Sequence, residues 1–123
     1  TGTWLALCPR ANRYTGAGSP PVPDLLKAGV NLCLGTDSLA GNWDLNLFGE
    51  MLWLHENFPA WPGDLWLRLG TLNGAETLGR DREFGSLTPG KQAALGFIPL
   101  NRGRDFWGEL FAQGAAGKWR WLG

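Results

Sequence analysis

The sequence contains a single histidine, His55, and only two cysteines, Cys8 and Cys33. A zinc site in a protein needs three or four converging ligands, most often His and Cys side chains, so these residues do not supply one by themselves. A Ser-His-Asp or Cys-His arrangement is equally hard to build around His55, which lies within a helical pattern. The cysteines lie in apolar, strand-like runs without metal-type spacing. That placement favours two reduced, buried thiols, with a single disulfide as the alternative.

The chain also lacks an excess of charge and a long apolar run. Eleven Lys and Arg residues are balanced by eleven Asp and Glu residues, which argues against electrostatic binding of nucleic acid or of an anionic membrane. No apolar run approaches the roughly 18–20 residues that span a bilayer, and the N-terminus does not resemble a signal peptide. We therefore expect a cytoplasmic protein without nucleic-acid or membrane partners. Because the chain does not start with Met, we also expect a processed chain or a piece of a longer protein.

What is present near the N-terminus is a strand–helix–strand pattern. The apolar run at 3–9 predicts a short buried strand closed by a proline, and residues 10–21 read as a Gly- and Pro-rich loop. Residues 22–29 predict a short helix, and 30–35 a second strand. Such a unit makes a parallel strand pair, and the continuous apolar character of 30–35 is typical of a strand covered on both faces.

Two longer helical patterns follow. The first covers 44–58, with Asn42 or Asp44 available as its N-terminal cap. Its wide apolar face predicts packing against the sheet on one side and against another helix on the other. The second helical pattern covers 62–79 and ends at a glycine.

The character of the sequence changes near residue 80. The following residues are interrupted by turn formers, and the charged–apolar alternation at 118–121 is typical of a strand with one solvent-exposed face. We therefore predict a boundary between an α/β part at 1–80 and a small β-rich segment at 81–123.

The strand at 30–35 delivers a carboxylate, Asp37, directly after its end. In parallel α/β folds the carboxyl ends of the strands form the crevice where reactive residues collect. Arg10 and Asn12 follow the other strand at the same edge. A carboxylate there can ligate a metal ion or take a proton from a bound water. The alternative is that Asp37 makes an Asx-type turn or caps a helix.

Several short motifs occur in a specific order along the chain. They lie in three blocks, at 7–18, 21–51 and 71–93, and read C-P-x-x-N, G-T-D-S, T-x-N-G-A and G-x-L-x-x-G-K. In this order the blocks resemble the carboxyl-terminal part of the metal-dependent amidohydrolase superfamily, most closely its deaminase and chlorohydrolase branch. The resemblance implies the last two βα units, strands seven and eight, of a (β/α)8 barrel. The residues after 80 would then be a small β segment of the flanking β-sandwich.

The resemblance also implies a chemistry. The aspartate that ends the last barrel strand in such enzymes touches the catalytic metal, zinc or iron. It takes a proton from the metal-bound water during attack on a ring carbon. Asp37 matches that position, as metal ligand and catalytic residue, while Arg10 and Asn12 match a loop that lines the substrate pocket. For Arg10, a surface salt bridge is an equally good interpretation. The implied substrate is a small aminated, purine-like heterocycle, although dechlorination uses the same aspartate.

This sequence departs from the family pattern in two respects. The His-x-His pair and the other histidine ligands of the superfamily are absent, and Ala94 stands where the family often has aspartate. We therefore expect the chain alone to be inactive and to need the remainder of the barrel or a second copy. His55 is expected to be packed or solvated, not a ligand.

Two other functions stay open. The first is a free-standing α/β binding or assembly module, in which open strand edges favour dimerisation. The second is a phosphate loop at Gly16 and Gly18, although Pro21 occupies the place of the third glycine and no Lys-Ser/Thr partner follows. Tryptophans near the C-terminus also suggest stacking on single-stranded nucleic acid. Strand alternation explains them more simply.

Overall fold

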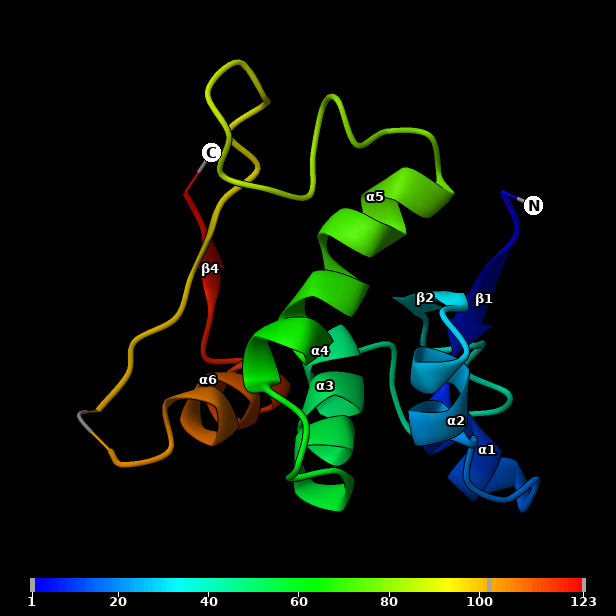
Figure 1. Ribbon diagram of the computed structural model, residues 1–123. Coiled ribbons are helices and arrows are strands. Elements are labelled where there is room, and N and C mark those ends of the chain that lie inside the picture. The colour runs from blue at the N-terminus through cyan, green and yellow to red at the C-terminus, as the bar shows by residue number, and fades with distance from the viewer. Residues whose placement is uncertain (1, 102, 123) are drawn as a thin grey trace.

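A parallel strand pair, a central group of helices and a C-terminal helix lie side by side in the computed structural model, which describes residues 2–101 and 103–122 (Figure 1). The elements in chain order are β1 (Trp4–Leu7), α1 (Pro9–Thr15), α2 (Val22–Lys27), β2 (Asn31–Leu34), α3 (Leu47–Asn57), α4 (Gly63–Gly70), α5 (Leu72–Thr77), β3 (Gly96–Phe97), α6 (Phe106–Ala115) and β4 (Arg120–Trp121). No helix of the described residues is long and apolar enough to cross a membrane.

Strands β1 and β2 pair in parallel, as the strand–helix–strand pattern predicted. The register runs from Trp4 opposite Asn31 to Leu7 opposite Leu34. Three of the four residues of β2 are buried, which confirms the expectation of a covered strand. The expectation of a buried β1 is wrong, since only Leu7 is buried and Leu5 is 42% exposed. The physical reason is that helices α4 and α5 pack against β2, whereas the main contact of β1 is with β2 itself.

The predicted loop at 10–21 contains a helix, α1. Pro9 occupies the first helical turn, where a missing N–H costs nothing and its fixed φ suits the helix. Gly16 ends α1 in the left-handed region, at φ 76°, and the backbone N–H groups that follow bond to the last helical carbonyls. Gly16 thus has a capping role in α1, which accounts for one glycine of the suggested phosphate loop.

Helix α3 begins later than predicted, and neither Asn42 nor Asp44 caps it. The cap is Asn46, whose side-chain oxygen accepts a hydrogen bond from the backbone N–H of Phe48 at 3.0 Å. Asp44 lies before the helix, where its carboxylate binds Arg10 and accepts the backbone N–H of Asn46.

The single helix predicted at 62–79 is two helices, α4 and α5. They meet at Thr71, whose backbone (φ −121°, ψ −87°) is not helical. The change of direction brings Asn73 of α5 to strand β2, where its side-chain amide donates a hydrogen bond of 2.7 Å to the carbonyl of Leu32. The break between α4 and α5 therefore gives the carbonyl of Leu32, in β2, a hydrogen-bond donor.

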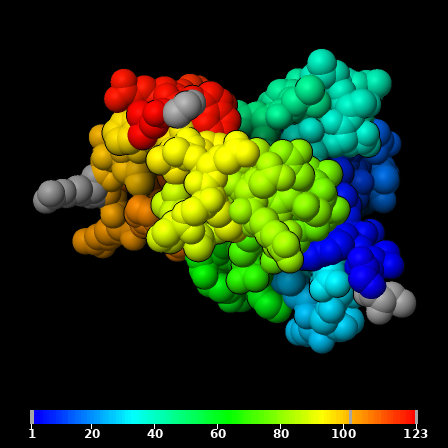
Figure 2. All heavy atoms as spheres, turned by 90° about the horizontal axis from the view of Figure 1, so that it is seen from above, coloured from blue at the N-terminus to red at the C-terminus, as the bar shows by residue number. Residues whose placement is uncertain are grey.

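The C-terminal segment differs from the expected β-rich unit. Its described residues hold the antiparallel pair β3 and β4 and also the ten-residue helix α6, which packs along α3. The Phe48 ring of α3 lies directly against Gly114 of α6, where any side chain would collide with it. Residues near 95 meet the C-terminus through the N–H of Leu122 and the carbonyl of Leu95, and Figure 2 shows this segment, in yellow, beside the red C-terminal residues. The boundary near residue 80 stays a prediction.

One hydrophobic core joins all these parts. It includes buried residues of β1, α2, β2, α3, α4 and α6, namely Leu7, Val22, Leu32, Leu34, Met51, Leu54, Trp66, Leu69 and Phe111. Because α6 contributes Phe111 to this core, the C-terminal helix is part of the same folded unit as the strand pair.

Truncation of this core residue tests the packing of α6. Phe111 is fully buried and stacks on Trp107 at a ring-centroid distance of 5.9 Å. We expect Phe111→Ala to lower the free energy of unfolding by about 3–5 kcal/mol in urea titrations. The control is Phe106→Ala on the same helix, where the ring is 53% exposed and the expected loss is below about 1 kcal/mol. Equal losses in the two variants would contradict the packing described.

Candidate functional site

Asp37 lies exposed in the loop that follows β2, at the carboxyl end of the strand pair. Its backbone adopts φ 59°, and it is the one non-glycine residue with positive φ in the described part of the chain. Its carboxylate oxygen Oδ1 accepts the backbone N–H of the next residue, Ser38, at 2.6 Å, which is neither the Asx-type turn nor the helix cap considered for it. A left-handed backbone of this kind costs about 1–3 kcal/mol and persists where the surroundings fix it.

Cys8 ends β1 beside the Asp37 loop. Burial is the main cause that raises the pKa of the Cys8 thiol, and a hydrogen bond from the backbone of Asp37 offsets part of that rise. Cys8 is therefore a neutral thiol that packs between the two strand ends. Both Cys8 and Cys33 are free, as expected, but only Cys33 is buried and Cys8 is half-buried.

The buried carboxylate of Glu50 connects the two strand-end loops. Glu50 is on α3 and fully buried, and its oxygen Oε2 accepts the backbone N–H of Arg10, after β1, at 2.8 Å. Its other oxygen, Oε1, accepts the side-chain amide of Asn42, after β2, at 2.8 Å. The same amide nitrogen of Asn42 donates to the carbonyl of Thr36 at 2.7 Å. Glu50 is thus joined to the residue that precedes Asp37.

Burial is the main influence on the acidity of Glu50. It raises the pKa of this carboxyl, while the hydrogen bonds from the Arg10 backbone and from Asn42 offset part of the rise. A buried carboxylate without such donors would cost far more free energy. Both hydrogen-bond donors therefore offset part of the free-energy cost of burying Glu50.

Arg10 forms an ion pair on the outside of α3. Its two guanidinium nitrogens donate to Asp44 at 2.8 and 2.9 Å, and the bond from Arg10 is the main cause of the lowered pKa of Asp44. The guanidinium also lies 5.7 Å from the ring centroid of Trp43, against which Tyr14 packs edge-on. The salt bridge considered for Arg10 from the sequence is therefore present.

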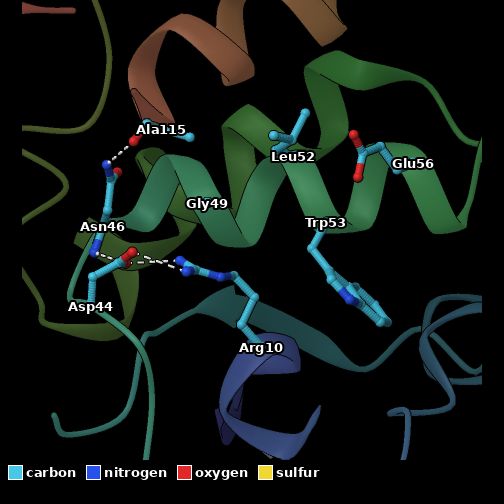
Figure 3. A pocket seen from close by; sticks show the side chains of 8 residues that line it. All are labelled: Arg10, Asp44, Asn46, Gly49, Leu52, Trp53, Glu56 and Ala115. Carbon is cyan, nitrogen blue, oxygen red and sulfur yellow. Dashed lines mark hydrogen bonds and ion pairs between the residues drawn. The ribbon is translucent and has the colours of Figure 1, made fainter. Parts of the chain in front are cut away.

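The side chain of Arg10 borders a cleft of about 250 Å³ along α3 (Figure 3). Its lining residues are Arg10, Asp44, Asn46, Gly49, Leu52, Trp53, Glu56 and Ala115. Gly49 leaves room for Arg10 in this cleft, because a side chain at position 49 would collide with the guanidinium. Asp37 is not among the lining residues, so the cleft does not join Arg10 to Asp37.

The remaining predicted residues occupy separate places. Asn12 is half-buried on α1, and its predicted contact with a substrate stays a prediction. His55 on α3 lies 3.0 Å from the carboxylate of Asp105, with its ring edge-on to Phe111. His55 thus packs between α3 and α6, away from the strand ends.

Sequence reasoning missed Glu50 and Asn46, and it considered Asn42 only as a helix cap. The signal for Glu50 was an acidic residue inside the apolar face of a helix, between Leu47 and Leu54 at helical spacing. Asn46 not only caps α3 but also donates to the carbonyls at the C-terminus of α6, at 3.0 and 3.1 Å. No local pattern indicates that bond, since its partner lies far along the chain.

A metal ion needs more than the strand ends provide. Within 2–101 and 103–122, no group of three or more His, Cys, Asp and Glu residues is placed to hold one. Asp37 is a single carboxylate, and the residues present do not fit a metal by themselves. Any metal at Asp37 needs ligands from elsewhere.

The titration of Glu50 gives a test of this polar cluster. Its pKa is raised in the folded chain above the ordinary value of 4.5, so the folded state binds the proton more tightly than the unfolded state. The free-energy contribution of the group is then greatest below pH 4.5 and declines as the pH rises through the raised pKa. Glu50→Gln does not titrate. We expect the unfolding free energy of wild type minus that of Glu50→Gln to fall as the pH rises from 4.5, measured by urea titration. A difference that grows with pH would show that the fold favours the ionised form.

Comparison with known proteins shows which family this chain resembles. The family model described as "Amidohydrolase family" matches residues 2–107. The 5-methylthioadenosine/S-adenosylhomocysteine deaminase of Teredinibacter turnerae is 35% identical over 108 residues, which are 82% of this chain and 24% of that protein. The enzyme of the same name from Syntrophobacter fumaroxidans is 42% identical over 94 residues, 71% of this chain and 22% of its own length. The chain thus spans about a quarter of the length of these curated relatives.

Solved structures give the same result for the fold. An adenosine deaminase from Xanthomonas campestris with bound zinc superimposes with a TM-score of 0.65 at 35% identity, over 74% of this chain and 22% of that one. The guanine deaminase of E. coli covers 95% of this chain and 30% of its own with a TM-score of 0.71, and at 22% identity it shows the fold alone. The chain is a small α/β unit that matches part of these deaminase structures, and the family match over most of its length shows that it belongs to the amidohydrolase family.

Proposed function

We propose that this chain is the carboxyl-terminal part of a metal-dependent hydrolytic deaminase that acts on an aminated, purine-like heterocycle. The observation that carries the proposal is Asp37, an exposed carboxylate in a strained left-handed conformation at the carboxyl end of a parallel strand pair. The family and the deaminase names of its relatives support the reaction class. In that enzyme β1 and β2 are the last two strands of a (β/α)8 barrel.

The open edge of β1 supports this placement in a barrel. Leu5 and Ala6 of β1 are exposed, although both are apolar. An uncovered apolar strand is suited to pairing with a further strand, as in a closed barrel. We place one missing strand on this edge and another on the outer edge of β2, so that the barrel closes. The β3–β4 pair, where Phe97 and Trp121 are exposed, would join a flanking β-sandwich in the same way.

Asp37 supplies proton transfer in the proposed reaction. Oδ1 of its carboxylate is held by Ser38, and no other hydrogen bond reaches the carboxylate from the described residues. We assign the free oxygen to accept a proton from the water that attacks the amino-bearing ring carbon. The carbon–nitrogen bond then breaks, and Asp37 passes the proton to the departing ammonia. Asn12, which follows β1 on α1, is proposed to border the substrate, whereas the Arg10 side chain is held in its ion pair with Asp44 on the outside of α3.

We further propose Asp37 as one ligand of a divalent zinc or iron ion whose other ligands lie outside these residues. The zinc in the related adenosine deaminase supports this choice of metal class. A second candidate function is an assembly module without catalysis, favoured by the same open β1 edge, in which a second copy covers that edge.

The oligomeric state separates these two candidates, since a dimer without metal would favour the assembly module, and metal content tests whether a second copy completes the site. Since the described residues hold no group of three ligands, we expect elemental analysis of the purified 123-residue chain to find no stoichiometric zinc or iron, and size-exclusion chromatography to find a monomer. Stoichiometric metal that is lost in Asp37→Asn, together with a dimer, would contradict this expectation and favour a site completed by a second copy.

Substitution of the carboxylate tests the reaction itself. In the complete enzyme that contains this segment, we expect Asp37→Asn to lower kcat for ammonia release from adenosine or 5-methylthioadenosine by about 10²–10⁴-fold, since the amide cannot accept the proton. The control is Asp24→Asn, at an exposed carboxylate in the first turn of α2, which should leave kcat unchanged. An Asp37→Asn variant with full turnover would falsify the assigned role.

A further inference from the structure

Asn42 is held by three hydrogen bonds that fix the orientation of its amide. Its nitrogen donates to Thr36 at 2.7 Å and to Glu50 at 2.8 Å, and its oxygen accepts the backbone N–H of Trp43 at 2.8 Å. Asn42 is only 3% exposed, so water cannot substitute for these partners. The carbonyl that Asn42 holds belongs to the peptide bond between Thr36 and Asp37. The orientation of this peptide therefore depends on the amide of Asn42.

Glu50 decides which way the amide of Asn42 points. An ionised carboxylate can only accept hydrogen bonds, and both of its oxygens are used here, by Arg10 and by Asn42. The amide nitrogen of Asn42 must therefore face Glu50, and in that orientation it also reaches Thr36. The rigid helix α3 thus acts on the Asp37 peptide through two side chains.

We propose that Glu50 and Asn42 are positioning residues that hold the Thr36–Asp37 peptide, and with it the Asp37 carboxylate, in the geometry that the reaction needs. The inference rests on the proposed function of Asp37. It gives a role to the carboxylate of Glu50, which is fully buried and reaches neither the proposed substrate nor the cleft beside Arg10. Such a restraint would have to maintain the strained, left-handed backbone of Asp37.

Substitution by amides and acids of the same shape separates positioning from stability. In Glu50→Gln, one oxygen becomes an NH₂ group. If that group faces Asn42, two donors meet, and Asn42 must turn over and lose its bonds to Thr36 and Trp43. In Asn42→Asp, the donor to Thr36 and to Glu50 disappears. In the double variant Glu50→Gln/Asn42→Asp, the link between positions 50 and 42 returns with reversed polarity, while the carbonyl of Thr36 still lacks its donor.

The experiment measures kcat, KM, Tm and backbone hydrogen exchange of residues 35–46 in the complete enzyme. We expect Glu50→Gln to lower kcat about 10–100-fold with little change in KM, and to speed exchange in this loop, because small displacements of a reacting group are costly. The double variant should regain most of the lost Tm but not kcat. Asp64→Asn, at an exposed carboxylate in the first turn of α4 and outside the cleft, is the matched control and should leave kcat, KM and loop exchange unchanged.

The outcomes separate this proposal from the proposed function. If kcat returns together with Tm in the double variant, or if Glu50→Gln leaves kcat and loop exchange as in wild type, the positioning role is overturned while the role of Asp37 stands. If Asp37→Asn is fully active, the proposed function fails. Loop exchange then still decides whether Glu50 and Asn42 restrain the Thr36–Asp37 peptide.

Discussion

The buried carboxylate of Glu50 is the contact on which the arrangement of the strand ends depends. A charge that is removed from water needs compensation, and here it comes from one backbone N–H group after β1 and one side-chain amide after β2. Two loops that are separate in sequence are therefore joined to one helix. Since α3 is itself packed against α6 and anchored there by Asn46, the strand ends are connected to the C-terminal part of the fold. A small unit with an open strand edge thus obtains a defined geometry at the carboxyl end of its strand pair.

Much of the fold could be predicted from the sequence where the deciding forces are local. Strand β2 follows from its continuous apolar run, and the parallel pairing follows from the short helix between two strands. Helix α1 was missed because Pro9 and Gly16 suggested a loop, whereas each has a fixed place at a helix end. The break at Thr71 could not be seen, since the apolar periodicity continues through it and the deciding bond, from Asn73 to Leu32, spans two distant elements. Helix α6 was hidden by its glycines, one of which is required by the neighbouring Phe48.

Like the fold, the candidate site has features that the sequence predicts and features that it does not. Asp37 could be found because its place after an apolar strand is a property of the local sequence. The partners of Glu50 could not, because Arg10 lies 40 positions away and the bond uses its backbone, which every residue other than proline offers. The ion pair of Arg10 with Asp44 was anticipated as a type of contact but without its partner. Long-range polar contacts thus escape sequence patterns even where the residues that make them look unusual.

The close approach of Arg10 to Gly49 has an evolutionary consequence. The guanidinium occupies the space that a side chain at position 49 would need, and from this place it donates to Asp44. A larger residue at position 49 would therefore displace the guanidinium of Arg10 from its present position. Loss of the arginine would in turn free position 44 from its acidic identity. Positions 10, 44 and 49 are accordingly expected to vary as a linked set when this segment is traced through diverging lineages.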